Sequence, residues 1–483
     1  MNEVALLVDG QPVTAEGGKS FQRANPVSGL AVTSAAAAGV ADVDRAVDAA
    51  AAAFPSWAAT GPGRRRELLL KAADALLARQ PDFIATVIAE TGATEGWAAF
   101  NVAFAASILR EAASTTSQIT GEIIPTDVPG NIAMAVRQPR GVCVGIAPWN
   151  APVILGIRAI AMPLACGNTV VFKASEACPA VHRLIGTSMQ QAGLPDGVLN
   201  VITNAPQDAA EIVGALIDHP AVRHVNFTGS TRVGRIVAER AARHLKPILL
   251  ELGGKAPLIV LDDADLDAAV NAAAFGAFLN QGQICMSTER VIIDDKVADE
   301  FVDRLSKKAA GLSLRDPMVG PAVLGSMMDS RSAERVTGLI QDAVRKGARV
   351  TAGGEGHGTL MPATVLDRVT SAMRIYAEES FGPVVSVVRV SGDDQALTVA
   401  NDTEYGLSAA IFSRDIARAW SLAQRVESGI CHINGPTVHD EAQMPFGGVK
   451  ASGYGRFGGK AGIDEFTTLR WITIQTGPRH YPF

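Results

Sequence analysis

The segment that decides the fold contains Val142-Cys-Val-Gly-Ile-Ala147, Thr169-Val-Val-Phe-Lys173 and Ile248-Leu-Leu-Glu-Leu252. Each is a short apolar run typical of a buried strand, and Val198–Ile202 and Arg223–Phe227 give two more. Helical patterns separate these five strands, at residues 152–164, 180–191, 208–217 and 231–243. Strict alternation implies a parallel sheet with right-handed crossovers, whose ligand lies beyond the carboxyl ends of the strands. The segment therefore predicts an α/β, Rossmann-like nucleotide-binding domain.

The remainder of the chain predicts a second α/β series and a small β ribbon. After Leu252, strands are expected at residues 258–261, 291–293, 384–390, 409–412 and 430–434, with helices at 265–279, 298–310, 333–346 and 416–426. Before the first series, Ala5–Val8 and Gln11–Val13 predict a hairpin around Asp9-Gly10, and residues 43–113 are helical. Residues 119–138 are punctuated by Pro and Gly and partly β-like, which is typical of a protruding ribbon.

The composition is that of an enzyme-sized α/β protein. The 483 residues suffice for two or three domains, and 48% of them are hydrophobic. A net charge of −6, without long charged blocks, makes nucleic acid and anionic membranes poor partners. We expect no secretory signal and no membrane span. Five cysteines without CxxC spacing disfavour a disulfide framework and a metal site, so a cytoplasmic protein without metal is expected.

Cys285 is the first candidate for chemistry. A thiol is a useful nucleophile only where its thiolate is favoured and accessible, and Cys285 follows a turn that contains Gly282 and has polar flanks. Cys143 and Cys166 lie in apolar runs, as core cysteines do. A single loop cysteine is more often structural than catalytic, so by itself the pattern leaves both interpretations open.

Three further motifs come after predicted strands. Glu251 ends an apolar strand and precedes Gly253-Gly254, where partial desolvation would raise its pKa toward use as a general base. Phe227-Thr-Gly-Ser230 opens a helix, as phosphate sites do, but matches neither GxGxxG nor a P-loop. Asn150, in Ala147-Pro-Trp-Asn150, could donate to a developing oxyanion. The alternatives are a surface glutamate, a capped turn and a capping asparagine.

The order of these motifs resembles that of the aldehyde dehydrogenase superfamily. Asn150, Phe227–Ser230, Glu251 and Cys285 follow in family order, and thirty-four residues separate positions 251 and 285, as the family pattern requires. The further matches are Lys173-Ala-Ser-Glu176, Glu378-Glu-Ser-Phe-Gly-Pro383, Asn401 with Tyr405-Gly-Leu407, and Pro445-Phe-Gly-Gly448. The resemblance covers essentially the full chain.

The resemblance implies covalent oxidation of an aldehyde to a carboxylate. The Cys285 thiolate would attack the carbonyl, and the Asn150 side chain and the Cys285 backbone N–H would hold the oxyanion of the thiohemiacetal. Oxidation would leave a thioester, and Glu251 would activate the water that hydrolyses it.

The resemblance also implies NAD as the cofactor, with NADP less favoured. Lys173 and Glu176 would meet the adenosine ribose, where a carboxylate accepts from a free 2′-hydroxyl but repels a 2′-phosphate. Glu379 would hold the nicotinamide ribose, and Phe381 would pack beside the ring. By family position the cofactor set is Pro148, Trp149, Lys173, Ser175, Glu176, Gly229, Ser230, Val233, Leu252, Gly253, Glu379 and Phe381.

Within the superfamily the chain looks most like bacterial salicylaldehyde, benzaldehyde and vanillin dehydrogenases. The likeness rests on residues 278–290, 373–376 and 453–457 and on the ending Tyr481-Pro-Phe483. It implies small aromatic aldehydes as substrates, with aliphatic aldehydes or semialdehydes as the alternative. By family position the substrate pocket would comprise Trp97, Ala151, Leu155, Arg158, Met286 and Phe446.

Two of these positions differ from many relatives. Arg158 stands where many relatives carry an aromatic residue, and it could contact a ring hydroxyl or serve as an interface or salt-bridge arginine. Phe457 stands where many relatives have a glutamate that is thought to relay protons, so that relay is absent or different here.

The family fold implies a division of the chain into three parts. Residues 1–121 and 139–252 would form the NAD-binding domain and 253–455 the catalytic domain, while 122–138 and 456–483 would form an oligomerisation ribbon and C-terminal tail. Because exposed edge strands are usually paired, a homodimer or homotetramer is expected.

Three other functions compete with this interpretation. Coenzyme A-acylating relatives lack a base at the position of Glu251, so its presence favours hydrolysis. A non-catalytic binding protein on the same fold would not need Cys285, Glu251 and Asn150 together. A simple alcohol dehydrogenase would need a zinc site or a Tyr-x-x-x-Lys pair in a short-chain context, and the chain shows neither.

Overall fold

The computed structural model describes residues 1–483, and its first large sheet has eight strands in the order β20-β12-β11-β8-β9-β10-β2-β3. The strands are β2 (Leu6–Val8), β3 (Gln11–Val13), β8 (Val142–Ile146), β9 (Thr169–Lys173), β10 (Leu199–Ile202), β11 (Val222–Thr228), β12 (Ile248–Glu251) and β20 (Gly453–Tyr454). The five strands from β8 to β12 are those predicted from the apolar runs, and they are parallel to one another.

Three antiparallel strands extend this sheet beyond its parallel centre. β2 and β3 form the expected hairpin, in which Asp9 (φ 50°) and Gly10 (φ 71°) make the turn, and β2 pairs with β10. β20 pairs with β12 at the opposite edge. Gly453 has φ 103°, and a Cβ there would lie 2.1 Å from the Leu250 carbonyl oxygen, so only glycine fits this close pairing. Residues 453–454, expected with the second α/β series, thus complete the first sheet.

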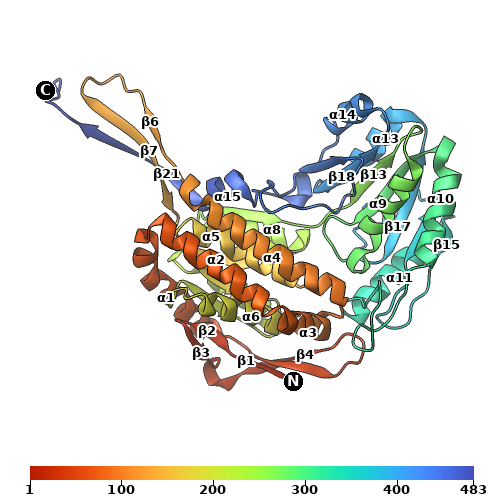
Figure 1. Ribbon diagram of the computed structural model, residues 1–483, viewed down its shortest axis with the longest axis horizontal. Coiled ribbons are helices and arrows are strands. Elements are labelled where there is room, and N and C mark those ends of the chain that lie inside the picture. The colour runs from red at the N-terminus through yellow and green to blue at the C-terminus, as the bar shows by residue number, and fades with distance from the viewer.

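Helices cover both faces of the first sheet, and together they form the first lobe. α1 (Val40–Ala59), α7 (Ala209–Asp218) and α8 (Thr231–Arg243) share a core with Val144 and Val171. α5 (Pro152–Ala165) and α6 (Pro179–Gln191) pack on the other face with Cys143 and Val170, and an outer layer covers them (Figure 1). That layer consists of α2 (Pro62–Ala78), α3 (Gln80–Thr91) and α4 (Glu95–Thr115). Alternate strand residues enter opposite cores, which explains why the strands are apolar throughout.

The second large sheet has seven strands in the order β15-β16-β17-β14-β13-β18-β19, and only β15 is antiparallel to its neighbour. The strands are β13 (Ala256–Val260), β14 (Thr288–Asp294), β15 (Arg349–Ala352), β16 (Thr364–Asp367), β17 (Val384–Val390), β18 (Ser408–Phe412) and β19 (Ile430–Ile433). The helices are α9 (Leu266–Phe278), α10 (Asp295–Ala310), α11 (Ser330–Arg345), α12 (Arg374–Ala377), α13 (Gly392–Asn401) and α14 (Ile416–Ala423). The sequence analysis missed β15, β16, α12 and α13; β15 is mostly exposed and α12 is a single turn, so neither shows a clear apolar pattern.

The two large sheets face one cavity with opposite ends of their strands. Thr228 and Glu251 end β11 and β12, while Cys285 and Phe381 precede β14 and β17, and all four line one cavity. The carboxyl ends of the first sheet therefore face the amino ends of the second, as expected for a ligand site of the first sheet.

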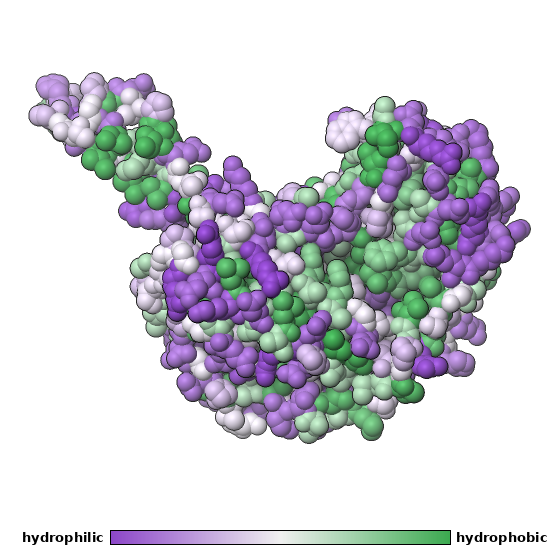
Figure 2. Space-filling view, in the orientation of Figure 1, coloured by the Kyte–Doolittle hydropathy of each residue, from purple (hydrophilic) through white to green (hydrophobic).

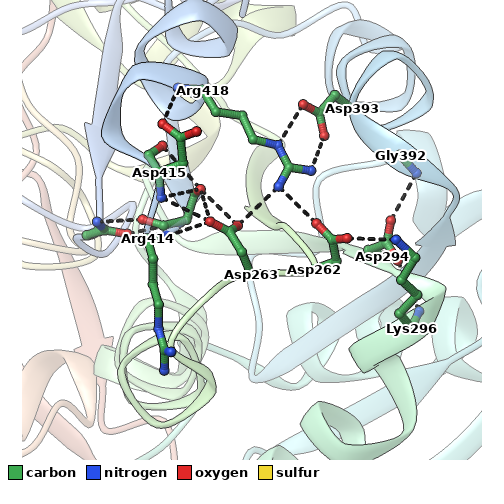
Figure 3. A network of polar contacts seen from close by, with 11 residues as sticks. Asp262, Asp263, Asp294, Lys296, Gly392, Asp393, Arg414, Asp415 and Arg418 are labelled. Atoms are coloured by element: carbon green, nitrogen blue, oxygen red, sulfur yellow. Dashed lines mark hydrogen bonds and ion pairs between the residues drawn. The ribbon is translucent and has the colours of Figure 1, made fainter.

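The carboxyl ends of the second sheet are closed by a polar network (Figure 3). Arg418 of α14 forms ion pairs with Asp262 (2.9 Å), Asp263 (3.2 Å) and Asp393 (2.5 Å), which follow β13 and β17. Asp294, at the end of β14, accepts hydrogen bonds from the backbone N–H groups of Lys296 and Gly392, both at 3.0 Å. An arginine thus occupies the edge at which an open α/β sheet would bind its ligand.

A three-stranded ribbon projects from the first lobe (Figure 1). β21 (Thr467–Gln475) pairs along its whole length with β7 (Asn131–Pro139), and β6 (Glu122–Ile124) forms the other edge. Ile123, Leu469 and Trp471 are 79%, 60% and 77% exposed, and apolar side chains gather on the ribbon in Figure 2. The ribbon thus presents an apolar surface.

Short elements complete the structure. They are β1 (Asn2–Val4), β4 (Ser20–Ala24), β5 (Ala31–Ala36), α15 (Gly459–Phe466) and the 3-10 turns η1 (Glu16–Gly18), η2 (Thr116–Gln118), η3 (Pro206–Asp208), η4 (Leu279–Gly282) and η5 (Lys450–Ser452). β1, β4 and β5 form a small sheet of their own. None of the helices combines the length and the apolarity needed to cross a bilayer.

Candidate active site

A cavity of about 480 Å³ lies between the two large sheets, and all three predicted catalytic residues line it. The first lobe contributes Pro148, Trp149, Asn150, Leu155, Thr228, Gly229, Ser230, Arg232, Glu251, Leu252 and Gly253 to its wall. The second contributes Cys285, Arg335, Glu379 and Phe381. Folding thus brings Asn150, Glu251 and Cys285 to one place from separate strand ends.

A sharp turn presents Cys285 to the cavity. Asn280, Gln281 and Gly282 follow one another with φ of 48°, 56° and 67°, a conformation that residues other than glycine rarely adopt. The Gln281 side chain donates to the Ser326 carbonyl oxygen at 3.0 Å, which supports the turn. A Cβ on Gly282 would lie 2.1 Å from the carbonyl oxygen of Gly382, so glycine is required there. The polar, glycine-containing turn seen in the sequence is therefore a strained and well-supported elbow.

Asn150 is held against this elbow. Its side-chain Nδ2 donates to the backbone carbonyl oxygen of Gln283 at 3.0 Å. The backbone carbonyl oxygen of Asn150 accepts from Trp97 Nε1 and Asn280 Nδ2, both at 2.9 Å. An amide nitrogen carries two protons, so one remains for a ligand. The Asn150 side chain is thereby fixed beside Cys285 with a donor to spare.

Glu251 is a buried carboxylate without a partner. It is 1% exposed, and neither carboxylate oxygen has a hydrogen-bond partner. Desolvation raises the pKa of Glu251 to about 7, although the nearby Cys285 thiol and the positive charge of Arg158 lower it in part. Because an unpartnered buried carboxylate is costly to a fold, its presence in a cavity wall points to chemistry rather than to stability.

The surroundings of Cys285 disfavour its thiolate form. Desolvation and the negative charge of Glu251 raise the pKa of Cys285 well above its usual range. Attack on an electrophile would therefore require the thiol to lose its proton as it reacts.

The other end of the cavity fits a dinucleotide. Gly229 and Ser230 lie at the N-terminus of α8, where Ser230 Oγ accepts from the Val233 N–H at 3.4 Å. Helix N-termini bind phosphate, and Arg232 adds a positive charge in the first turn. A Cβ on Gly253 would lie 2.7 Å from Glu379 Oε2, so glycine leaves room for this carboxylate at the wall. The wall thus combines anion-binding donors with a carboxylate that can accept from a ribose.

The comparisons with known proteins agree with this geometry. Residues 13–472 match the model of the Aldehyde dehydrogenase family. The chain belongs to this family. It is 64% identical to a vanillin dehydrogenase of Pseudomonas fluorescens over 482 residues, 100% of each chain.

Solved structures of other aldehyde dehydrogenases share its fold. A salicylaldehyde dehydrogenase from Pseudomonas putida G7, complexed with salicylaldehyde, matches with a TM-score of 0.99 and 51% identity over 100% of both chains. PnpE, in complex with nicotinamide adenine dinucleotide, matches with a TM-score of 0.95 and 36% identity over 100% of this chain and 99% of that one. The predicted family and α/β fold are confirmed, and the cofactor is a nicotinamide dinucleotide.

Four predicted cofactor residues of this aldehyde dehydrogenase lie outside the cavity wall. Lys173, buried at the end of β9, forms an ion pair with Glu176, and Asn204 donates to the same Glu176 oxygen at 2.9 Å. The backbone N–H of Ser175 donates to His182 Nδ1 at 3.0 Å, and its hydroxyl oxygen accepts from the Ala177 N–H at 3.3 Å. The Val233 N–H donates to Ser230 Oγ in the cap of α8, and its side chain packs against the core beneath that helix.

Of the six predicted substrate-pocket residues, only Leu155 lines the large cavity. The other five do not line it and are at most 7% exposed: Trp97, Ala151, Arg158, Met286 and Phe446. Arg158 and Phe446 line a separate small cavity. Arg158 forms an ion pair with Asp440, and its guanidinium lies 4.3 Å above the Phe446 ring. The structure thus shows Arg158 in a salt bridge, and its contact with a ring hydroxyl of a substrate stays a prediction.

Phe457, which stands where many relatives have a glutamate, packs among apolar side chains. Its backbone and that of Phe446 exchange two hydrogen bonds of 2.9 Å, and its ring lies 6.3 Å from that of Phe466. The residue is 2% exposed, and its side chain has no titratable group that could relay a proton.

Two residues of the cavity wall, Arg232 and Arg335, were missed by the sequence analysis, and Thr228 appeared there only within the Phe227–Ser230 motif. The position of Arg232 could have indicated an anion site, because a positive charge in the first turn of a helix is unfavourable with the helix dipole unless an anion binds there. Arg335 comes from the middle of α11, and nothing in the pattern of that helix points to the cleft.

Proposed function

We propose that this aldehyde dehydrogenase oxidises small aromatic aldehydes of the salicylaldehyde, benzaldehyde and vanillin type to carboxylates, with NAD as cofactor. One observation carries the chemistry: the Cys285 thiol, the unpartnered Glu251 carboxylate and the Asn150 amide share one cavity wall. The names of relatives that match along the full chain support the substrate class.

The first step forms a bond between Cys285 Sγ and the aldehyde carbon. As this bond forms, the S–H bond breaks and the thiol proton passes to solvent water in the cavity. The carbonyl oxygen becomes an oxyanion, and the free proton of Asn150 Nδ2 and the Cys285 backbone N–H would hold it. Each such donor stabilises the transition state by about 3 kcal/mol. Pro148, Trp149, Gly229, Ser230, Leu252, Gly253, Glu379 and Phe381 would hold the cofactor in the cavity, and it supplies the two-electron acceptor that turns the thiohemiacetal into a thioester.

The second step hydrolyses the thioester. Glu251 would take a proton from the attacking water, whose oxygen bonds to the acyl carbon. The C–S bond then breaks, Cys285 leaves as a thiolate, and the acid is released. A pKa of about 7 suits Glu251 to this role, because an effective base titrates near the working pH.

We further propose that the two sheets divide these tasks. The first lobe, residues 1–121 and 139–252 with β20, makes most of the cofactor contacts, and residues 253–452 supply Cys285 together with Glu379 and Phe381. Residues 122–138 and β21 serve assembly.

The substrate class is tested by measuring NADH formation with salicylaldehyde, benzaldehyde, vanillin and hexanal. We expect kcat/KM for the aromatic aldehydes to exceed that for hexanal by about 10-fold or more, since shape and ring contacts in an apolar pocket discriminate by about 1–3 kcal/mol. A preference for hexanal would contradict the proposed substrate.

Glu176 is expected to favour NAD over NADP. Lys173 and Asn204 both contact Oε1 of Glu176, which leaves Oε2 as the acceptor for a ribose 2′-hydroxyl. A 2′-phosphate would meet this negative charge, so Glu176→Gln should lower the NAD-to-NADP ratio of kcat/KM by about 10-fold, the effect of roughly 1.4 kcal/mol. Glu211→Gln, on the exposed side of α7, is the control. An NADP preference in the wild type, or an unchanged ratio in Glu176→Gln, would refute this role.

The apolar ribbon is expected to assemble the enzyme into a homodimer or homotetramer. Trp471 lies on the edge strand β21 and is 77% exposed, and unpaired edges with apolar side chains tend to pair. Trp471→Lys should therefore reduce the mass measured by light scattering. Trp420→Lys changes a tryptophan on α14 that is 60% exposed and should leave the mass unchanged. A monomeric wild type would rule this assembly out.

A further inference from the structure

A fully buried ion pair lies behind the cavity wall and belongs to neither the catalytic nor the cofactor set. Lys255 Nζ and Glu289 Oε2 are 2.6 Å apart, and the two side chains are 0% and 4% exposed. Lys255 directly follows Gly253-Gly254, and Glu289 is the second residue of β14. The pair therefore lies next to segments that form the cavity without lining it.

The Glu289 carboxylate is saturated by the loop that precedes β17. Its Oε1 accepts from Ser380 N (3.0 Å), Ser380 Oγ (2.9 Å) and Phe381 N (3.1 Å), and its Oε2 accepts from Ser380 N at 3.1 Å and from Lys255. Ser380 and Phe381 directly follow Glu379, whose carboxylate reaches the cavity. One buried carboxylate thus holds the backbone that carries two wall residues.

The loop needs this anchor because its backbone is strained. Phe381 has φ 45°, which costs a residue with a side chain about 1–3 kcal/mol. Arg335 binds the outer side of the loop, with Nη1 donating to the Glu379 carbonyl oxygen at 2.8 Å and Nη2 to that of Ser380 at 2.6 Å. The Gly254 N–H fixes Glu379 Oε1 at 2.8 Å. Glu289 therefore binds the N–H groups of the loop from inside while Arg335 binds its carbonyl groups.

Stability alone does not account for the ion pair. Buried ion pairs rarely stabilise a fold more than apolar residues of the same size would, because both charges must be desolvated. Charge does strengthen hydrogen bonds, and the Lys255 ammonium group lies against the same carboxylate that accepts from three loop donors.

We infer that Glu289, neutralised by Lys255, is a positioning residue that sets the Glu379–Phe381 loop and thereby the affinity for the nicotinamide half of the cofactor. The inference rests on the proposed contact of Glu379 with the cofactor.

Two matched double variants test this role. Lys255→Met/Glu289→Gln and Lys255→Met/Glu289→Leu both remove the two charges, so neither leaves a buried charge unpaired. Glutamine keeps an acceptor oxygen for Ser380 and Phe381, whereas leucine keeps none. Differences between the two variants therefore report the anchoring of the loop, and equal melting temperatures would show that both fold.

Two readouts apply, and the first needs no cofactor. Amide hydrogen exchange of a peptide covering residues 376–384 should be faster in the leucine variant, because the N–H groups of Ser380 and Phe381 lose their acceptor. NAD titration by protein fluorescence should show affinity at least about 10-fold weaker in the leucine than in the glutamine variant, with KM for NAD changed more than kcat. Equal exchange and equal NAD affinity would overturn the inference.

Glu379→Ala separates this inference from the proposed function. Unchanged NAD affinity in Glu379→Ala would refute the proposed contact of Glu379 with the cofactor. Weakened affinity in Glu379→Ala, with equal affinities in the two double variants, would refute the anchor instead.

Discussion

Cys285→Ala is expected to abolish aldehyde oxidation while leaving NAD binding intact. Cys285 is the one thiol in the cavity wall, and Cys143, Cys166 and Cys178 are buried elsewhere in the first lobe. Loss of a covalent nucleophile typically lowers kcat by about 10⁴-fold or more, since the remaining groups can only bind and polarise the substrate. NADH formation measures the loss, and fluorescence titration with NAD measures binding.

The control for this variant is Cys431→Ala. Cys431 is partly exposed on β19 and lies outside the cavity, so its removal should leave turnover at the wild-type level. Substantial oxidation by Cys285→Ala would exclude the covalent route. A wild-type protein that binds NAD and oxidises none of the aldehydes would instead be a binding protein on the same fold.

Glu251→Gln is expected to stop the reaction after the first half. The amide cannot accept a proton from water, so steady-state turnover should fall by about 10²- to 10⁴-fold. Formation of the thioester does not use this base, so about one NADH per active site should still appear in a rapid burst. Stopped-flow absorbance measures both phases. If the burst of NADH and the steady-state rate fell in the same proportion, Glu251 would act in the steps that form the thioester.

The pH dependence follows from the same carboxylate. Burial raises the pKa of Glu251 to about 7, and only the deprotonated form accepts a proton. Where hydrolysis limits the rate, turnover of the wild type should therefore rise as the pH increases through about 7. In Glu251→Gln this rise should vanish, whereas a rise shared by both proteins would belong to another group.

The sequence predicts the parallel strands well for a physical reason. Both faces of β8 and β9 are buried, so Cys143 and Val144 enter opposite cores and the strand is apolar at every position. β15 and β20 show no such pattern, since β15 is mostly exposed and β20 has only two residues. The positions of β15 and β20 depend on pairing with other strands, and the local sequence pattern does not reveal which strands pair.

The sequence analysis singled out three side chains that the structure brings to one cavity wall, because each belongs to a recognisable motif. Asn150, Glu251 and Cys285 each follow or precede a strand and occur in family order, so their convergence could be anticipated. The contact between Arg158 and Asp440 could not be predicted from the sequence, because the two residues lie in distant segments that come together only in the folded chain.

The contacts of buried side chains next to the cavity wall could not be predicted from the sequence either. Glu289 looks like one more charged residue in a strand, and nothing in its neighbours reveals that it holds the loop of Phe381. Trp97 does not line the large cavity, and its indole N–H donates to the backbone carbonyl oxygen of Asn150. Such roles emerge only from hydrogen bonds between distant segments.

The central claim is that Cys285 carries the acyl group that Glu251 releases. The most direct test is mass spectrometry of Glu251→Gln mixed with vanillin and NAD and quenched within the burst. The account predicts a mass increase equal to the acyl group, located on the peptide that contains Cys285 and absent without NAD. An unmodified Cys285 peptide after a full burst of NADH, or an acyl group on another residue, would contradict it.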